Sequence, residues 1–296
     1  MSRKRIFLTG ASGFLGRHVL HSLLKNNYDL FVTRFTSPLP DDGSFNIIYA
    51  DMGTPGSLAM AAKKSSPDVV LHIAAMTSSE ACEIDPARAN RINVESTREL
   101  LSELKPHKTR FIFISTDLVF DGLKGFYCES DSPNPGLHYA KTKLEAERLV
   151  QSWGKNYVIL RLALMYGPAL GARESFAGWL EKGLRKGCVM LFTDEWRTPL
   201  FVEDAAHALE LLITSDFCGT LHLGGNERCS RYEFGIEFAR RGGYDTNSIS
   251  AISLKEANLK YYRPPDVSLD STLAKRLLGI KPASIQEGIG KFFERR

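Results

Sequence analysis

Tyr139 and Lys143 form a pair whose side chains can act together in acid–base chemistry. They lie four positions apart in Leu137–Trp153, a segment with helical periodicity, so both face the same side of a helix. A free tyrosine has a pKa near ~10, and a neighbouring ammonium lowers that value by favouring the phenolate. Tyr139 thereby becomes a usable general acid or base near neutral pH. The same spacing also arises by chance on surface helices, so this interpretation depends on the surrounding elements.

Three glycines supply that context, because they are spaced by three between a predicted strand, Arg5–Thr9, and a predicted helix, Phe14–Lys25. Gly10 permits a tight turn, Gly13 lets the backbone approach a pyrophosphate, and Gly16 lets the helix pack closely on the sheet. Free N–H groups and the dipole at the helix start favour phosphate. The alternative is an ordinary glycine-rich turn, which the strand–turn–helix context disfavours. The predicted cofactor contacts in this loop are Gly10, Ser12, Gly13, Phe14, Leu15 and Gly16.

The end of the second predicted strand, Leu30–Thr33, bears on which dinucleotide is bound. Folds selective for NAD place an acidic residue at this end, but Asp29 lies at the opposite end of the strand. Arg34 follows the strand and can form a bidentate contact with a 2′-phosphate. The sequence therefore favours NADP(H), with NAD(H) possible. The alternative is that Arg34 is a solvated surface arginine.

Polar residues also follow the third and fifth predicted strands, Asn46–Tyr49 and Arg110–Ser115. The carboxylate of Asp51 is predicted to accept the adenine amino group with Met52 against the ring, or else to cap a helix. Ser115 or Thr116 is predicted to donate a hydrogen bond to a substrate carbonyl, since ligands bind at the carboxyl edge of a parallel sheet. The alternative for these two hydroxyls is simple termination of the strand.

The elements that must position these residues alternate along the first two-thirds of the chain. Near-continuous apolar strands alternating with helices predict an α/β fold with a doubly wound parallel sheet, the Rossmann arrangement. The remaining predicted strands are Asp68–Ile73, Tyr157–Leu162 and Gly219–Leu223, and the remaining helices are Pro86–Leu104, Arg173–Gly187 and Val202–Ile213. The helix at Arg173–Gly187 is predicted to be amphipathic, with Phe176, Trp179, Leu180 and Leu184 on one face and Glu181, Lys182 and Arg185 on the other.

The predicted dinucleotide-binding domain covers residues 1–167, with 199–225 returning to it. The predicted substrate-binding part is smaller and comprises residues 168–198 and 226–296. The chain of 296 residues is 43% hydrophobic and 24% charged, which excludes a disordered protein. Its net charge is +4, which does not favour binding to nucleic acid or to an anionic membrane surface.

The cysteines and apolar runs predict neither a disulfide framework, nor a metal site, nor a membrane span. The five cysteines include no C-x-x-C pair, and the seven histidines are scattered, with nothing acidic or thiol-bearing joining His18 and His21. No apolar run reaches the ~18 residues of a span, and the first apolar stretch breaks at Gly10, too early for a signal peptide. We therefore expect a reducing, cytoplasmic location.

Taken together, the motifs resemble those of the extended short-chain dehydrogenase/reductases, and the resemblance covers nearly the whole chain. It rests on the glycine loop, His72-Ile73-Ala74-Ala75, Asn93, Ser115-Thr116-Asp117, Tyr139 with Lys143, Arg161, Tyr166-Gly167, Arg197-Thr198-Pro199, Val202-Glu203-Asp204 and Arg263-Pro264 with Ser268-Leu269-Asp270. Residues 115–122 and the Arg-Pro to Ser-Leu-Asp signature look most like the dTDP-4-dehydrorhamnose reductase group.

The resemblance implies a role for each matching residue. Tyr139 would donate the proton, Thr116 would hold the carbonyl, and Lys143 would bind the nicotinamide ribose. Arg197 or Arg263 would clamp the phosphates of the substrate nucleotide. Further implied contacts with the cofactor are Ala74, Ala75, Met76, Asn93, Ser115, Tyr139 and Lys143, and further contacts with the sugar are Thr77, Thr116 and Asp117.

Two departures limit the assignment of a substrate. Leu118 stands where these reductases usually have tyrosine, and Leu164 stands where they usually have tryptophan. An apolar Leu118 also disfavours the related 4,6-dehydratases, which usually have glutamate at that position. The expected function is NADPH-dependent reduction of a nucleotide-linked 4-keto-6-deoxy sugar, in a chain that can form a homodimer. The alternatives are an NAD-dependent nucleotide-sugar 4-epimerase and a non-catalytic, dinucleotide-binding regulatory subunit resembling that of methionine adenosyltransferase.

Overall fold

The computed structural model describes residues 3–40 and 42–295, and the chain forms two units built from interleaved segments. Unit 1 comprises residues 1–116, 137–161 and 206–221. Unit 2 comprises residues 117–136, 162–205 and 222–296. None of the helices in the described ranges is long and apolar enough to cross a bilayer.

Unit 1 is organised by a seven-stranded sheet with the order β11-β6-β5-β4-β1-β2-β3. Its strands are β1 (Arg5–Thr9), β2 (Asp29–Arg34), β3 (Asn46–Tyr49), β4 (Val69–His72), β5 (Arg110–Thr116), β6 (Tyr157–Leu162) and β11 (Gly219–Leu223). The pairs β1–β2, β1–β4, β2–β3 and β4–β5 are parallel, and their register places Thr9, His72 and Phe113 side by side. The doubly wound fold is therefore confirmed, and the strand order reverses between β1 and β4, where such sheets bind ligands.

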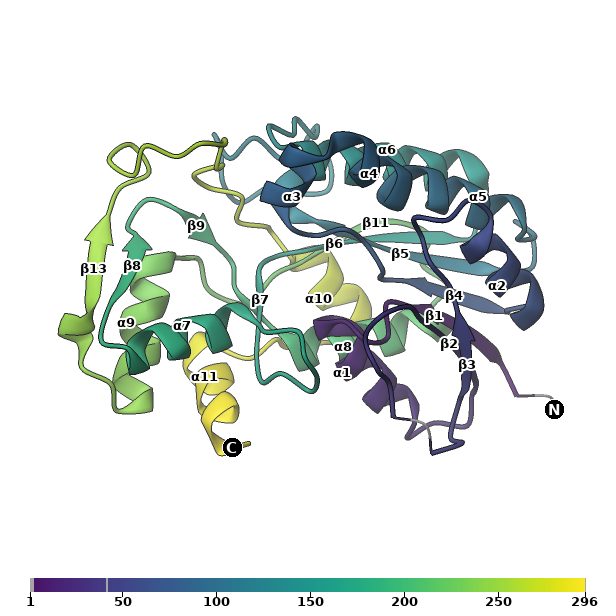
Figure 1. Cartoon of the computed structure of the whole chain (residues 1–296), viewed down its shortest axis with the longest axis horizontal. Coiled ribbons are helices and arrows are strands. Elements are labelled where there is room, and N and C mark those ends of the chain that lie inside the picture. The colour runs from purple at the N-terminus through teal and green to yellow at the C-terminus, as the bar shows by residue number, and fades with distance from the viewer. Residues whose placement is uncertain (1–2, 41, 296) are drawn as a thin grey trace. The chain divides into compact units, whose positions relative to one another are not determined.

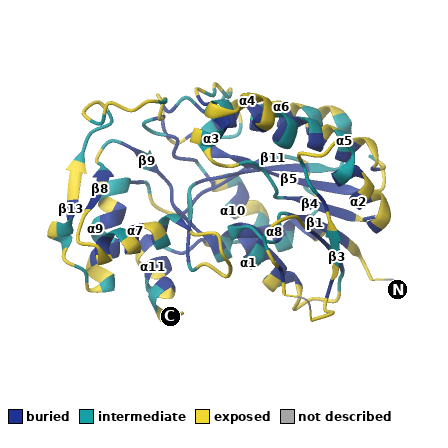
Figure 2. Cartoon of the chain, in the orientation of Figure 1, coloured by how far each residue is buried: buried dark blue, intermediate teal, exposed yellow. Residues whose placement is uncertain are grey.

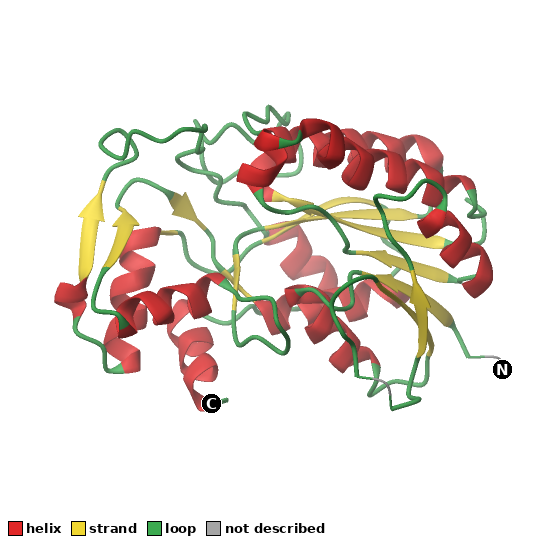
Figure 3. Cartoon of the chain, in the orientation of Figure 1, coloured by secondary structure: helices red, strands yellow, loops and turns green. Residues whose placement is uncertain are grey.

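Helices cover both faces of this sheet (Figures 1 and 3). One face carries α2 (Ser57–Ser65), α5 (Ser96–Ser102) and α6 (His138–Trp153), and the other carries α1 (Phe14–Leu23) and α8 (Val202–Thr214). The first face buries a core that includes Phe7, Leu58, Leu100, Phe111 and Val150. Apolar side chains on both faces of the strands explain the near-continuous apolar runs of the sequence.

The long helical segment predicted at Pro86–Leu104 is interrupted in the structure. It consists of α4 (Pro86–Asn90), a π-helical turn over Arg91–Glu95 and α5, and it is preceded by a short helix α3 (Ser79–Ile84). Single π turns inside α-helices re-aim side chains and occur frequently at functional sites. Here the turn carries Asn93, which is buried.

Unit 2 combines two-stranded pairings with helices around a separate apolar core. The strands are β7 (Met165–Tyr166), β8 (Val189–Phe192), β9 (Trp196–Arg197), β10 (Leu200–Phe201), β12 (Cys229–Ser230) and β13 (Ile249–Ile252). The helices are α7 (Phe176–Arg185), α9 (Arg231–Gly242), α10 (Thr272–Leu278) and α11 (Ile285–Glu294). Tyr166, Leu180, Phe234, Phe238 and Ile289 belong to the core, and Figure 2 shows buried faces on α7, α9 and α11.

The predicted apolar face of α7 is partly wrong. Trp179 is 49% exposed, whereas Glu181 is only 4% exposed. The carboxylate of Glu181 tolerates burial because it accepts hydrogen bonds from the Tyr244 hydroxyl at 2.5 Å and from the Arg185 guanidinium at 3.1 Å. Tyr244 is distant in the sequence, so helical periodicity alone could not indicate this partner.

The two units also divide the chain differently from the predicted domains. Residues 117–136 belong to unit 2, although the prediction placed them in the dinucleotide-binding domain. The reason lies in backbone pairing, because Tyr127 N donates to Ser268 O at 2.8 Å and Asp270 N donates to Tyr127 O at 2.9 Å. Of the predicted returning segment 199–225, only residues 206–221 lie in unit 1.

Candidate active site

The glycine loop forms a tight turn in which an added side chain has no room at Gly10 or Gly16. Gly10 has a φ of +73°, and a Cβ there would lie 2.8 Å from Ala74 N. A Cβ on Gly16 would lie 2.0 Å from Gly10 O. A Cβ on Gly13 would meet only Gly10 O, at 3.1 Å, so the space beyond this glycine is open. The loop therefore fits a dinucleotide, whose pyrophosphate needs close approach to backbone N–H groups.

Replacing Gly16 with alanine is expected to destabilise the protein by about 2 kcal/mol or more, because the new methyl group overlaps a carbonyl that cannot move freely. The matched control is Gly290→Ala in α11, where an added Cβ meets no atom within 4 Å. That change should be neutral or stabilising, since alanine favours helix more than glycine does. Urea denaturation of both variants checks the prediction, and equal midpoints would contradict it.

The start of α1 is suited to an anion. Gly13 is the N-cap residue, no side chain caps the helix, and its first turn contains no acidic residue. Leu15 is buried, so it can contribute only its backbone to a ligand, whereas Ser12 and Phe14 are half-buried. Arg17, which no sequence motif indicates, donates from its guanidinium to Pro38 O at 2.8 Å, and its Nε is buried without a hydrogen-bond partner.

Arg34 lies at the end of β2 and is exposed, as a contact with a 2′-phosphate requires. The Arg17 guanidinium reaches the loop that follows Arg34, so two arginines border this loop. The helix cap considered for Asp51 is wrong, because α2 begins at Ser57 with Gly56 as its N-cap, whereas the predicted contact with adenine stays a prediction. The Asp51 carboxylate instead accepts hydrogen bonds from Gly53 N and the Thr54 hydroxyl, both at 2.9 Å.

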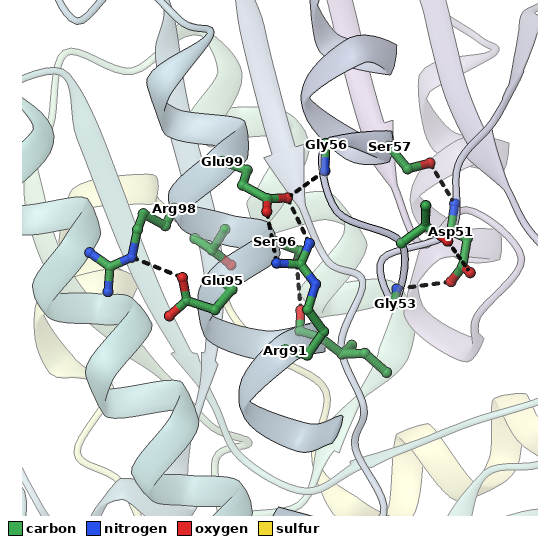
Figure 4. A network of polar contacts seen from close by, with 12 residues as sticks. Asp51, Gly53, Gly56, Ser57, Arg91, Glu95, Ser96, Arg98 and Glu99 are labelled. Carbon is green, nitrogen blue, oxygen red and sulfur yellow. Dashed lines mark hydrogen bonds and ion pairs between the residues drawn. The ribbon is translucent and has the colours of Figure 1, made fainter. Parts of the chain in front are cut away.

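A polar network ties this turn region to the π turn (Figure 4). The Arg91 guanidinium donates twice to Glu99, at 2.8 and 2.6 Å, and Glu99 also accepts from Gly56 N at 2.9 Å. Ser57 Oγ accepts from Asp51 N at 3.0 Å. Met52 packs on the core of unit 1 and is half-buried, so it retains a partly exposed surface for a ring. The start of α2, the Asp51 turn and the π turn are thus held together.

Thr116, Tyr139 and Lys143 all lie in unit 1, where α6 packs against β5. Their exposed fractions are 7%, 8% and 2%. Lys143 Nζ lies 3.9 Å from the centre of the Phe113 ring, which places the lysine over the strand that ends at Thr116. The start of α6 is held by Glu83, whose carboxylate accepts from His138 N at 2.7 Å. Thr116 therefore ends β5, and α6 carries Tyr139 one turn before Lys143, whose amine lies against the same strand.

Burial lowers the pKa of Lys143 to about 7, although Glu147 one turn later acts in the opposite direction. In the unfolded chain the amine titrates near its usual value of ~10.5, so between pH 7 and 10 the unfolded state holds more protons. Lys143 should therefore make the free energy of unfolding increase, and the protein more stable, as the pH rises through this range. The Lys143→Met variant should lack that contribution in chemical denaturation of cofactor-free protein. The control Lys141→Met removes an exposed lysine from the same helix and should follow the wild type.

The hydroxyl of Ser115 is buried and has no hydrogen-bond partner. An unsatisfied buried hydroxyl is costly, so a ligand that supplied a partner would stabilise this position. Together with the open space at Gly13, this orphaned hydroxyl supports a fit to a dinucleotide along the carboxyl edge. No group of His, Cys, Asp or Glu suited to a metal ion occurs within residues 3–40 and 42–295.

The loop after β4 contains the other predicted cofactor contacts. Ala74, Ala75 and Met76 are half-buried and Thr77 is exposed. Asn93 is only 2% exposed, and its amide accepts from Met76 N at 2.8 Å and donates to Met76 O at 3.1 Å. It therefore holds this loop rather than presenting its amide to a ligand, which argues against the direct cofactor contact predicted for it.

The remaining predicted substrate residues, Asp117, Arg197 and Arg263, lie in unit 2. The guanidinium of Arg197 is 3% exposed and donates to Glu195 at 2.9 Å and to Pro264 O at 3.1 Å. Arg263 also contacts Glu195, at 3.2 Å, but its side chain is 45% exposed. Burial lowers the pKa of Arg197, while Glu195 and Asp117 counteract this effect. Only Arg263 retains surface for a phosphate, so the geometry disfavours the alternative assignment to Arg197.

Residues 4–296 match the family described as the RmlD substrate binding domain. The probable low-salt glycan biosynthesis reductase Agl14 of Haloferax volcanii is 27% identical over 288 residues, covering 96% of this chain and 95% of that protein. Methionine adenosyltransferase 2 subunit beta of Xenopus tropicalis is 30% identical over 237 residues, covering 78% and 70%.

A solved structure, dTDP-4-dehydrorhamnose reductase of Bacillus anthracis in complex with NADP, shows the same fold. Its TM-score is 0.87 at 22% identity, and the match covers 100% of both chains. The sequence motifs, the sheet order and a family match that spans nearly the whole chain agree with one another. The chain belongs to the RmlD substrate binding domain family, among the extended short-chain dehydrogenase/reductases.

Proposed function

We propose that this chain is an NADPH-dependent reductase that acts on a nucleotide-linked 4-keto-6-deoxy sugar. The observation that carries the proposal is that Thr116, Tyr139 and Lys143 are all buried in one unit. Lys143 of α6 contacts Phe113 of β5, so the helix packs on the strand that ends at Thr116. The glycine loop lies in the same unit. The family match supports an oxidoreductase acting on sugar nucleotides.

In this proposal the residues of the chain orient a ketone and protonate it. The dinucleotide, when bound, supplies a hydride to the carbonyl carbon. Tyr139 donates its phenolic proton to the carbonyl oxygen as that oxygen gains negative charge. Thr116 donates a hydrogen bond to the same oxygen, which stabilises the charge as it develops. Lys143 binds the ribose of the cofactor and, as an ammonium, favours release of the Tyr139 proton.

The preference for NADPH is proposed to reside in Arg34, with Arg17 at the same loop as a second candidate. Arg34→Ala should weaken NADPH binding by about tenfold or more, because a charge-assisted contact with the 2′-phosphate is lost. NADH binding should stay unchanged. Arg148→Ala, which removes an exposed arginine from α6, is the matched control. Titration of both dinucleotides against each variant checks this, and an equal loss for NADPH and NADH would refute a phosphate contact.

The experiment that tests the function follows NADPH absorbance after dTDP-4-keto-6-deoxy sugar is added to the purified protein. Rapid loss of NADPH, slower loss of NADH and formation of the reduced sugar nucleotide are expected. Other sugar nucleotides are tested in parallel, because Leu118 and Leu164 differ from the residues usual in the rhamnose-type reductases. If NADPH binds but no ketosugar nucleotide is reduced, the proposed reductase activity is refuted.

A second candidate is a non-catalytic role, favoured by the 30% identity to methionine adenosyltransferase 2 subunit beta. Such a chain would bind the dinucleotide and a protein partner without turnover. The two candidates separate in one assay, because only a reductase consumes NADPH. A nucleotide-sugar 4-epimerase would instead retain its dinucleotide through purification, which the absorbance spectrum of the protein reveals.

A further inference from the structure

A chain of buried side chains crosses unit 1 beneath the predicted cofactor contacts. Thr9, His72, Thr97 and Asn93 are exposed by 0%, 1%, 0% and 2%. They come from β1, β4, α5 and the π turn, and the sheet register places Thr9 beside His72. The side chain of Thr9 is hydrogen-bonded to His72 and that of His72 to Thr97, and the Thr97 hydroxyl is bonded to the backbone carbonyl of Asn93, although positions 9, 72 and 97 are far apart in the sequence.

The proton positions on the Nδ1 side of His72 follow from two backbone N–H groups, which can only donate hydrogen bonds. Ile73 N and Ala74 N both donate to the Thr9 hydroxyl at 3.1 Å. The hydroxyl has one proton, and it lies 2.8 Å from His72 Nδ1. Since its lone pairs are engaged by the two amides, Thr9 must donate to Nδ1, which therefore carries no proton.

The proton position on the Nε2 side of His72 follows from the backbone carbonyl of Asn93, which can only accept a hydrogen bond. Thr97 Oγ1 donates to the backbone carbonyl of Asn93 at 2.8 Å, which uses its single proton. His72 Nε2 lies 3.0 Å from Thr97 Oγ1, so the ring nitrogen must be the donor. Both sides therefore require the neutral ring with its proton on Nε2, and every hydrogen bond runs in one direction.

At one end of this series of hydrogen bonds, Asn93 contacts the backbone near the predicted catalytic residues. Asn93 is bonded to both polar groups of the Met76 backbone, and its Nδ2 also donates to the Thr142 hydroxyl at 2.9 Å. Thr142 in turn donates to the backbone carbonyl of Tyr139 at 2.7 Å. The opposite end of the chain, Thr9, immediately precedes Gly10 and holds the backbone of residues 73 and 74.

We propose that His72 and Thr97 are positioning residues for the cofactor-binding edge, acting through this one-directional chain with His72 as the neutral Nε2–H tautomer. A charged ring would carry a proton on Nδ1 that faces the donating hydroxyl of Thr9, so the chain excludes it. In agreement, burial and the nearby Lys143 lower the pKa of His72 to about 3. The effect on cofactor binding rests on the proposed function, whereas the tautomer does not.

The tautomer is tested by ¹⁵N NMR of the imidazole nitrogens in cofactor-free protein, with His72 assigned by correlation to its backbone. A protonated Nε2 and an unprotonated Nδ1 are expected throughout pH 5 to 8. A proton on Nδ1, as either tautomer or as imidazolium, would overturn the proposal. This measurement uses the wild-type protein and requires no variant to fold.

The positioning role is tested with three variants. Thr97→Val keeps the shape of the side chain but leaves His72 Nε2–H without an acceptor, and should weaken NADPH binding by about tenfold. Thr97→Ser restores the hydroxyl and should restore affinity. Thr109→Val is the matched control, because it removes a buried hydroxyl that donates to Pro67 O at 3.2 Å at the amino edge of the sheet.

The outcomes separate this inference from the proposed function. Equal NADPH affinity for Thr97→Val and Thr109→Val would overturn the positioning role even if the enzyme is a reductase. If the wild type reduces no ketosugar nucleotide but the variants show the expected NADPH affinities, the reductase activity is refuted. The positioning role of His72 and Thr97 is then still supported. Failure of the wild type to bind NADPH would overturn both the function and the positioning role, with the tautomer still decided by NMR.

Discussion

Replacing Tyr139 with phenylalanine is expected to lower turnover by about 100-fold or more, because the proton donor to the carbonyl oxygen is removed. The change deletes one oxygen atom from a side chain that is 8% exposed, so the packing of α6 on β5 should persist. The dissociation constant of NADPH should change by less than about threefold, since binding energy comes mainly from the glycine loop and the phosphates. Single-turnover kinetics and NADPH titration measure the two quantities separately.

The control for this variant is Tyr157→Phe. Tyr157 begins β6, at the opposite edge of the sheet from Thr116, and is half-buried in the same unit. Its turnover should match the wild type. Full turnover in Tyr139→Phe would remove the tyrosine from the mechanism. Loss of turnover in both variants would show that removing a tyrosine hydroxyl from unit 1 is damaging in general. The result would then not support a role for Tyr139 as the proton donor.

Replacing Glu147 with glutamine is expected to destabilise the protein by about 3 kcal/mol or more, because it leaves a buried guanidinium without its carboxylate. Arg161 donates to Glu147 through Nε at 3.0 Å and through Nη2 at 2.6 Å. The two side chains are only 5% and 1% exposed, so water cannot replace the lost partner. Urea denaturation near neutral pH measures the difference in the free energy of unfolding.

The control here is the exposed pair of Glu95 and Arg98, whose side chains are 37% and 51% exposed. Glu95→Gln should cost less than about 0.5 kcal/mol, as exposed helical pairs usually do. The double variant Glu147→Met with Arg161→Met should recover part of the stability, since replacing both charges removes the uncompensated one. A loss for Glu147→Gln no larger than for Glu95→Gln would contradict the importance of burial.

The Glu147 variant should also affect the amine one turn away. Glu147 raises the pKa of Lys143 against the larger effect of burial, so its removal should lower that pKa below about 7. If the charged amine assists Tyr139, kcat should then begin to fall at a lower pH in Glu147→Gln than in the wild type. This shift in the pH profile would distinguish an electrostatic role for Glu147 from a purely structural one.

Much of the fold could be predicted because its determinants are local in the sequence. The bounds predicted for β1, β3, β6 and β11 match the structure, since short apolar runs bordered by polar or glycine residues mark strands clearly. The glycine spacing identified the turn for the same reason. The Tyr139–Lys143 pair was found through the helical period, which places positions four apart on one face.

What could not be predicted depends on partners that are distant in the sequence. The burial of Glu181 depends on Tyr244, and the membership of residues 117–136 in unit 2 depends on pairing with Ser268 and Asp270. The π turn breaks the 3.6-residue period in the middle of a predicted helix, so no periodic pattern could place Asn93 inward. The helix cap considered for Asp51 is wrong because the sequence does not show that α2 begins only at Ser57.

The interleaving of the two units limits how the gene can be divided. A chain truncated at the end of β6, after residue 162, would still carry residues 117–136 but would lose 206–221, and with them β11 and most of α8. β6, five of whose six residues are buried, would become an unprotected edge strand open to pairing with other chains. The amino-terminal half is therefore not a separable dinucleotide-binding module, and insertions or fusions are better tolerated at exposed loops than at a boundary drawn through the middle of the sequence.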